Sequence, residues 1–273
     1  MKIDICFITS TPHLTSHAAL GHRELSLAHM LLGDKEYAQY YTNTPRYTIM
    51  DNSAFEFEHT GRGVPQDMVL EAAKLSRPNE ICAIDVLFNG SDTVASVKEF
   101  ISFIKSQDSQ LFETTKFMAI PQGKTADEWL DCYEKLVVME DVDVIGLSKL
   151  AVPESFYGNH TDAGNCTEGR MKCVDFLVEH KMTPNLFDKE THLLGSDDRG
   201  VQELSYYYSK NYSWIRSNDT SMPFVYGYNN KKIVDGKADD IILEKLDFNK
   251  KLSMVEMKTV DDNFITWRTI NVN

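Results

Sequence analysis

Short apolar segments alternate with longer segments of helical periodicity along most of this chain, and this alternation limits the folds that it can adopt. Seven apolar segments of strand length are bounded by turn residues, at residues 2–9, 47–51, 81–88, 116–121, 142–148, 191–196 and 212–217. Amphipathic segments predict helices at residues 23–32, 65–75, 93–106, 125–138, 168–180 and 199–210. Continuous apolar strands separated by helices are typical of a parallel sheet that helices cover on both faces.

Two architectures fit this alternation, an open doubly wound sheet and a closed barrel. Dinucleotide-binding open sheets carry a glycine-rich turn after the first strand, whereas this chain has TSTPHLTSH there. We therefore predict a (β/α)8 barrel, as a single domain over residues 1–273 with its core in residues 1–230. The eighth strand is not apparent. Residues 231–273 contain a possible helix at 238–248 and two β-like segments, LSMVEMKTV and FITWRTINV, which would close the barrel or form an extension across its bottom.

Charge and composition narrow the functional classes. The formal net charge of −13 disfavours unspecific binding to nucleic acid, although residues 231–273 hold eight basic and eight acidic residues. No apolar run is long enough for a membrane span, and MKIDICFITSTPH lacks the features of a signal peptide. Five scattered cysteines favour free thiols and a reducing compartment. We expect a soluble cytoplasmic protein with no membrane partner.

Polar residues stand at the ends of the predicted strands, where a barrel of this kind builds its active site. In chain order these residues are Asp51 in MDNSAF, Asp85 in AIDV, Gln122 in IPQG, Gly146 in IGLS, Gly195 in LLGSDD and Asp219 in SNDTSMP. A single aspartate after a strand is more often a helix cap or a turn residue. Their joint occurrence favours a site instead.

Three carboxylates and an amide at one barrel mouth suit glycosyl transfer from a nucleoside. One carboxylate can attack the anomeric carbon, a second carboxyl can protonate the leaving base, and a third can accept hydrogen bonds from the ring N–H and amino groups of the base. A glutamine both donates and accepts, so it suits the carbonyl edge of a purine.

Six short motifs in order then give the chain a resemblance to the guanine transglycosylases, which replace guanine in nucleic acid by a 7-deazaguanine. MDNSAFE is similar to the family's D-S-G-G-F/Y-Q, AIDV to A-L-D-E, AIPQG to I-V-Q-G-G, VIGLSKLAVPE to A-I-G-G-L-A-V-G-E, HLLGSDD to L-M-G-V-G, and DTSMP to D-C-V-x-P. The resemblance runs from about residue 47 to residue 223, roughly two-thirds of the chain.

The resemblance implies a role for each matched residue. Asp219 would be the nucleophile and Asp51 the general acid and base. Substrate binding would fall to Phe55, which would stack on the base, to Leu194 on its other face, and to Asp85, Gln122, Gly146 and Gly195 around its polar edge. The family's reaction needs no cofactor and no catalytic metal.

Departures from the family pattern bear on the substrate. The chain lacks the arginine-rich segment after Pro223 and the C-x-C-x-x-C zinc site of the tRNA enzymes, so we expect no zinc-binding subdomain. A short chain of this kind resembles the DNA-acting branch of bacteriophages and bacterial modification clusters, which inserts preQ0 or a relative and would act in the host cytoplasm if viral. Such an enzyme must flip the base out of the duplex.

DNA is therefore the expected macromolecular partner, with tRNA as the less favoured substrate. Because the chain is acidic, DNA binding would need a local basic rim, for which Lys124, Lys149, Arg199 and Arg216 lie near the strand ends, or a basic partner subunit. Two other classes stay open: a metal-dependent hydrolase barrel, and a non-catalytic relative that binds nucleic acid or a partner enzyme. The histidines after the first strand, including His13 and His17, favour loop packing over metal binding.

Overall fold

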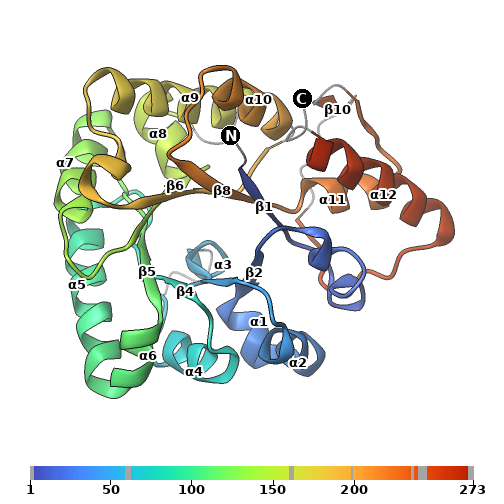
Figure 1. The fold of residues 1–273 in the computed structure, drawn as a ribbon, viewed down its shortest axis with the longest axis horizontal. Helices are drawn as coiled ribbons and strands as arrows, with labels where there is room; N and C mark the ends of the chain where they lie inside the picture. The colour runs from blue at the N-terminus through green and yellow to red at the C-terminus, as the bar shows by residue number, and fades with distance from the viewer. Residues whose placement is uncertain are drawn as a thin grey trace.

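Eight parallel strands surrounded by helices form the centre of the protein in a computed structural model, which describes residues 3–58, 63–159, 163–197, 199–234, 237–238 and 245–269 (Figure 1). The strands are β1 (Asp4–Phe7), β2 (Glu24–Leu27), β3 (Thr48–Asp51), β4 (Glu80–Cys82), β5 (Lys116–Ala119), β6 (Val144–Ser148), β7 (Glu190–Leu194) and β8 (Ile215–Thr220). From β2 to β8 each strand pairs with its neighbour in the chain, and β8 pairs with β1. The predicted (β/α)8 architecture is thus confirmed.

The barrel is nearly closed between β1 and β2, the two ends of the sheet. Cys6 and Arg23 form a parallel bridge, and the N–H of His22 donates to the carbonyl of Ile5 at 2.8 Å. The prediction of a helix over residues 23–32 is wrong for its first half, since Glu24–Leu27 is the missing strand and all four of its residues are buried. Helix α1 covers only Ala28–Gly33.

Helices connect the strands, and most of them cover the outside of the barrel (Figure 1). They are α1, α2 (Lys35–Asn43), α3 (Ala54–Glu58), α4 (Gln66–Ser76), α5 (Gly90–Gln107), α6 (Ser109–Thr114), α7 (Ala126–Val137), α8 (Ala151–Tyr157), α9 (Ala163–Glu179), α10 (Gly200–Ser209), α11 (Met222–Tyr228) and α12 (Met254–Thr269), with short 3-10 turns at Thr11–His13, Ala18–Leu20 and Pro184–Phe187. Helix α5 begins at an Asn89 cap, whose side chain accepts from the N–H of Asp92, and buries Val97, Phe100 and Ile104.

The described residues of the C-terminal segment supply no barrel strand. The two β-like segments expected there lie largely in α12, where Val260, Phe264 and Trp267 recur at helical spacing and are buried. Helix α12 packs against α11 on the outside of the barrel (Figure 1). A two-stranded ribbon of β9 (Ile233–Val234) and β10 (Lys237–Ala238) precedes it. Most of the helix expected at residues 238–248 lies outside the described residues.

Two apolar layers pack on opposite sides of the strands. The larger layer fills the space between the strands and the helices, and includes Ile81, Phe117 and Leu193. A smaller layer fills the barrel interior with Cys6, Leu25, Leu27, Ile49, Cys82, Met118, Ile120 and Val144. Because side chains of a strand alternate between the two layers, the residue two positions after an interior side chain also faces the interior. This rule places Asp51 of β3 above Ile49, at the carboxyl end of the barrel.

An irregularity in β8 changes which side chains face inward. Thr191 of β7 aligns with Ile215, whereas the next residue, His192, aligns with Ser217, so Arg216 is an extra residue on β8. A bulge of this kind re-aims side chains locally. Both Arg216 and Ser217 consequently reach groups inside the barrel, Glu80 for Arg216 and His192 for Ser217.

Candidate active site

A cavity of about 520 Å³ opens at the carboxyl ends of the strands. Its polar lining includes the carboxylates Asp51, Glu56, Asp85, Asp197 and Asp219 and the amines of Lys149 and Lys245. Apolar side chains, among them Leu25, Leu27, Phe55, Ile120, Leu194 and Phe248, form much of the remaining wall. The three aspartates predicted at strand ends are therefore brought together in one cavity of a size that accommodates a small ligand.

Asp219 lies near the end of β8 and is only 5% exposed. Its Oδ1 receives two hydrogen bonds, from the N–H of Gly195 at 2.8 Å and from Nε2 of His192 at 3.0 Å. These two contacts fix the orientation of the carboxylate. The described residues offer Oδ2 no hydrogen-bond partner, so this oxygen is left for a ligand in the cavity.

A buried arginine holds the turn that supplies the Gly195 N–H. Arg170 of α9 donates to the carbonyls of Leu147, Leu194 and Gly195 at 3.1, 3.0 and 2.8 Å. Its charge is balanced by Glu203 of α10, at 2.6 Å, and both side chains are 1% exposed. The ion pair between Arg170 of α9 and Glu203 of α10 thus fixes the carboxyl ends of β6 and β7 from the side of the surrounding helices.

Asp51 differs from Asp219 in its electrostatic surroundings. Burial and the negative charge of Glu56 raise the pKa of Asp51 well above its ordinary value, and the charges of Asp219 and Asp85 act in the same direction. The N–H of Ser53 donates to Oδ1 of Asp51 at 2.6 Å, which opposes the rise only in part. Asp51 is consequently suited to carry a proton that it can donate.

Ser53 turns the chain directly after Asp51 with a φ of 67°, in the left-handed region that favours glycine. His29 of α1 fixes this residue, because both its main-chain N–H, at 3.3 Å, and its Nδ1, at 2.9 Å, contact the Ser53 hydroxyl. Ser53 therefore holds Asp51 after β3, and His29 of α1 in turn holds Ser53.

Asp85 follows β4 and is held by two side-chain amides. Nδ2 of Asn52 donates to Oδ1 at 2.9 Å, and Nε2 of Gln122 donates to Oδ2 at 2.5 Å. Burial nevertheless raises the pKa of Asp85 to about 6. At neutral pH the carboxyl is mostly ionised and can accept hydrogen bonds from a ligand that enters the cavity.

Two of the predicted ligand-binding residues do not line the cavity. Gln122 is fully buried, and its Oε1 accepts from the N–H of Phe88 at 3.0 Å while its amide holds Asp85. Gly146 lies within β6, where an added Cβ would come 2.7 Å from Leu194 and 2.8 Å from Met118. Gln122 therefore positions Asp85, and Gly146 leaves space for the side chains beneath the cavity floor.

Phe55, Leu194 and Gly195 do line the cavity, as predicted. Phe55 belongs to the short helix α3 and is 37% exposed, and the amine of Lys245 lies 4.8 Å from the centre of its ring. Gly195 has a φ of 70°, and an added Cβ there would come 2.6 Å from the side chain of Lys149. The aromatic and the two lysines thus stand together at the mouth of the site.

Of the four cations predicted for a nucleic-acid rim, Lys149 alone lines the cavity within the described part of the chain. Lys124 and Arg199 lie on the loops after β5 and β7, and Arg199 pairs with Glu168 at 3.3 Å. Arg216 is not at this rim. The strand that carries it extends to Thr220 rather than to Ser217, so Arg216 lies near the opposite end of the barrel, paired with Glu80 at 3.0 Å and Glu190 at 2.7 Å.

Three further residues of the site were missed from the sequence. Asn52 follows Asp51 and binds Asp85, Lys245 reaches the cavity from the C-terminal segment, and His192 contacts Asp219 from within the barrel. A signal existed for His192, because it stands two residues before Leu194 and therefore faces the same side of β7. No local pattern marks Lys245.

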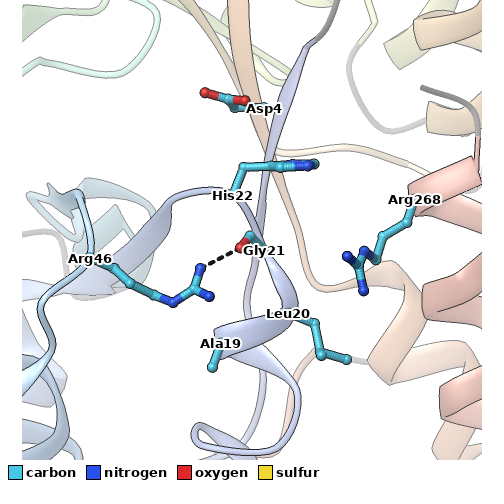
Figure 2. A pocket seen from close by; sticks show the side chains of 7 residues that line it. All are labelled: Asp4, Ala19, Leu20, Gly21, His22, Arg46 and Arg268. Atoms are coloured by element: carbon cyan, nitrogen blue, oxygen red, sulfur yellow. Dashed lines mark hydrogen bonds between the residues drawn. The ribbon is translucent and has the colours of Figure 1, made fainter. Parts of the chain in front are cut away.

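A second hollow lies at the amino ends of β1 and β2, between Asp4, the Gly21 turn and Arg268 (Figure 2). Figure 2 shows Arg46 and Arg268 pointing toward this turn from opposite sides, and Arg46 donates to the carbonyl of Gly21. Asp4 is bound by Arg23 at 3.0 Å. Among the described residues Asp4 is the one carboxylate that lines this hollow, whereas several carboxylates line the cavity at the carboxyl ends, which is therefore the candidate active site.

Within the described ranges, no three histidine, cysteine, aspartate or glutamate side chains are grouped so that they could hold a metal ion. His17 instead contacts Asp261 of α12 at 3.0 Å, and His13 accepts from the N–H of Leu252 at 3.1 Å, so both tie the C-terminal segment to the barrel. The helices of the described part are too short or too polar to cross a membrane.

The fold and the cavity define a (β/α)8 barrel with a cluster of carboxylates at its carboxyl end. No protein-family model matches this chain, and a search of curated proteins finds no significant match.

Proposed function

We propose that this protein exchanges guanine in DNA for a 7-deazaguanine base through a covalent intermediate on Asp219. The observation that carries the proposal is the contrast between two aspartates of one cavity. Two hydrogen bonds hold Oδ1 of Asp219 and leave its Oδ2 to the cavity, whereas the raised pKa of Asp51 favours the protonated acid. A double-displacement glycosyl transfer requires an oriented carboxyl group as nucleophile and a second carboxyl group that can donate a proton.

In the proposed reaction, Oδ2 of Asp219 attacks C1′ of a flipped nucleotide and forms a C–O bond. The C1′–N9 bond breaks, its electron pair leaves with guanine, and the base takes a proton from Asp51. The incoming base then loses a proton to Asp51 and displaces Asp219 from C1′. The sequence returns both carboxyl groups to their initial states, so no cofactor is consumed.

The base would be recognised by Asp85, which would accept hydrogen bonds from its N–H groups. Asn52 and Gln122 support this role because they fix both oxygens of the carboxylate. Phe55 and Leu194 supply apolar surface for the faces of the purine. The left-handed φ of Ser53 also suits the proposal, because the resembling motif of the transglycosylases has glycine at this position.

DNA is preferred to tRNA because the sequence lacks both the zinc-binding cysteines and the arginine-rich segment of the tRNA enzymes. Among the residues that the structure describes, Lys149 and Lys245 are the lysines that line the cavity, and a phosphate backbone would rest on them. DNA binding by the purified protein alone tests whether a basic partner subunit is needed in addition to this surface.

The proposal is tested by label transfer. Purified protein is incubated with radiolabelled guanine or preQ0 and with either duplex DNA or unfractionated tRNA. We expect label in DNA, loss of this activity in Asp219→Asn, and retention in Asp131→Asn, a control on the outer surface of α7. Label in tRNA alone would exclude DNA as the substrate, and no label in either polymer would overturn the proposed function.

A further inference from the structure

A continuous polar chain runs through the otherwise apolar interior of the barrel and ends at Asp219. At its lower end, Arg216 is held by Glu80 at 3.0 Å and by Glu190 at 2.7 Å. Nε of Arg216 lies 3.1 Å from the hydroxyl of Ser217, which lies 2.7 Å from Nδ1 of His192. Nε2 of His192 then reaches Oδ1 of Asp219 at 3.0 Å.

The donors and acceptors along this series of hydrogen bonds, from Arg216 to Asp219, fit only one arrangement of protons. The guanidinium of Arg216 always carries a hydrogen on Nε, so Ser217 accepts from it. The Ser217 hydroxyl has His192 as its other partner among the described residues, and it therefore donates its single hydrogen to Nδ1. With Nδ1 as an acceptor, the imidazole proton stands on Nε2, where it is donated to Asp219.

Burial disfavours any other arrangement of these protons. His192 and Ser217 are both fully buried, and the surrounding interior layer consists of side chains such as Cys82, Met118 and Val144. A second hydrogen on Nδ1 would leave the Ser217 hydroxyl without an acceptor, and buried polar hydrogens without partners are rare in proteins. The bulge at Arg216 is what allows two consecutive residues of β8 to join the chain.

We propose that His192 is a positioning residue, held by Ser217 and Arg216 as its Nε2–H tautomer, which binds Oδ1 of Asp219 and leaves Oδ2 as the attacking oxygen. The attack rests on the proposed function above, whereas the proton arrangement does not. The donated hydrogen bond fixes the rotation of the carboxylate in a cavity that also contains Asp51 and Asp85.

The tautomer is tested directly by NMR of protein labelled with ¹⁵N in its histidine side chains. The signal of His192 is the one missing from His192→Gln among the eight histidines. We expect a protonated Nε2 and an unprotonated Nδ1 at neutral pH. In Ser217→Ala this preference should weaken, whereas Ser26→Ala, which alters a buried serine on β2, should leave it unchanged. An imidazolium, or a proton on Nδ1, would overturn the proposed chain.

The positioning role is tested by the rate at which protein becomes attached to DNA. His192→Gln keeps an N–H donor near Nε2, whereas His192→Met removes it. We expect His192→Met to lose roughly 100-fold in rate with an unchanged KM for DNA, and His192→Gln to recover most of it.

These outcomes separate the two proposals. Attachment to DNA with equal rates in His192→Met and the native protein would refute the positioning role and leave the proposed function standing. The expected tautomer in a protein that never attaches to DNA would refute the proposed function and leave the hydrogen-bonded chain standing. Thermal unfolding of each variant shows that it is folded at the assay temperature.

Discussion

The main-chain N–H of Gly195 donates to Oδ1 of Asp219 at 2.8 Å, from a backbone whose φ is 70°. Only glycine adopts this conformation without strain, and the side chain of Lys149 lies across the position of a Cβ at 2.6 Å. The contact therefore connects the turn after β7 to the end of β8. It depends on the identity of one residue.

Gly195→Ala is expected to cost about 1–2 kcal/mol in the free energy of unfolding and to slow covalent attachment to DNA. Gly158→Ala is the matched control, because Gly158 has a φ of 73° and open space around its Cβ position. Urea unfolding should show comparable losses in the two variants, while only Gly195→Ala changes the attachment rate. Equal attachment rates would show that the turn does not position Asp219.

Glu56→Gln is expected to shift the alkaline limb of the kcat/KM profile to lower pH. The negative charge of Glu56 contributes to the raised pKa of Asp51, so its removal makes Asp51 lose its proton at lower pH. Glu36→Gln, on the outer helix α2, serves as the control and should leave the profile unchanged. An alkaline limb that does not move would mean that Asp51 is not the general acid.

Asp85→Asn should remove a pH dependence from the stability of the protein. The pKa of Asp85 in the folded state is about 6, above its ordinary value of 3.8. As the pH falls, the folded protein therefore binds this proton at a higher pH than the unfolded protein does, and the proton stabilises the folded state. The stabilisation is complete below pH 4 and is lost as the pH rises through 6. Between pH 7 and pH 5 the native protein should gain about 1 kcal/mol relative to Asp85→Asn in urea unfolding. An equal response of both proteins would contradict the assigned pKa.

Glu203→Gln is expected to cost about 3–5 kcal/mol, because it leaves the buried guanidinium of Arg170 without its counter-charge. Asp131→Asn breaks an exposed ion pair of the same 2.6 Å length with Lys135 and should cost less than about 0.5 kcal/mol. Chemical denaturation of both variants gives the comparison. Similar costs would mean that Arg170 does not depend on Glu203.

Much of the barrel was predictable because each strand lies in a local apolar segment between polar turns. The exception was β2, since four residues are too few to distinguish a period of 2 from a period of 3.6, and Glu24–Leu27 runs directly into α1. In the C-terminal segment the spacing of Val260, Phe264 and Trp267 is helical, yet the intervening β-branched residues suggested strands.

The aspartates of the site were predictable for the same reason, because a carboxylate after a parallel strand lies at the carboxyl end of the barrel. Side-chain direction was harder to predict. Gln122 is turned into the protein by Phe88 and Asp85, and Arg216 is re-aimed by a bulge that only the register of β7 and β8 reveals. These features depend on contacts between strands that no single segment of sequence encodes.

The covalent bond itself is the most direct test of the account. The protein is incubated with a guanine-containing oligodeoxynucleotide and a 7-deazaguanine analogue, denatured, digested and analysed by mass spectrometry. We predict a deoxyribose ester, with the base lost, on the peptide that contains Asp219, and no ester in Asp219→Asn. The absence of any adduct in the native protein, or the same adduct in Asp219→Asn, would contradict the account.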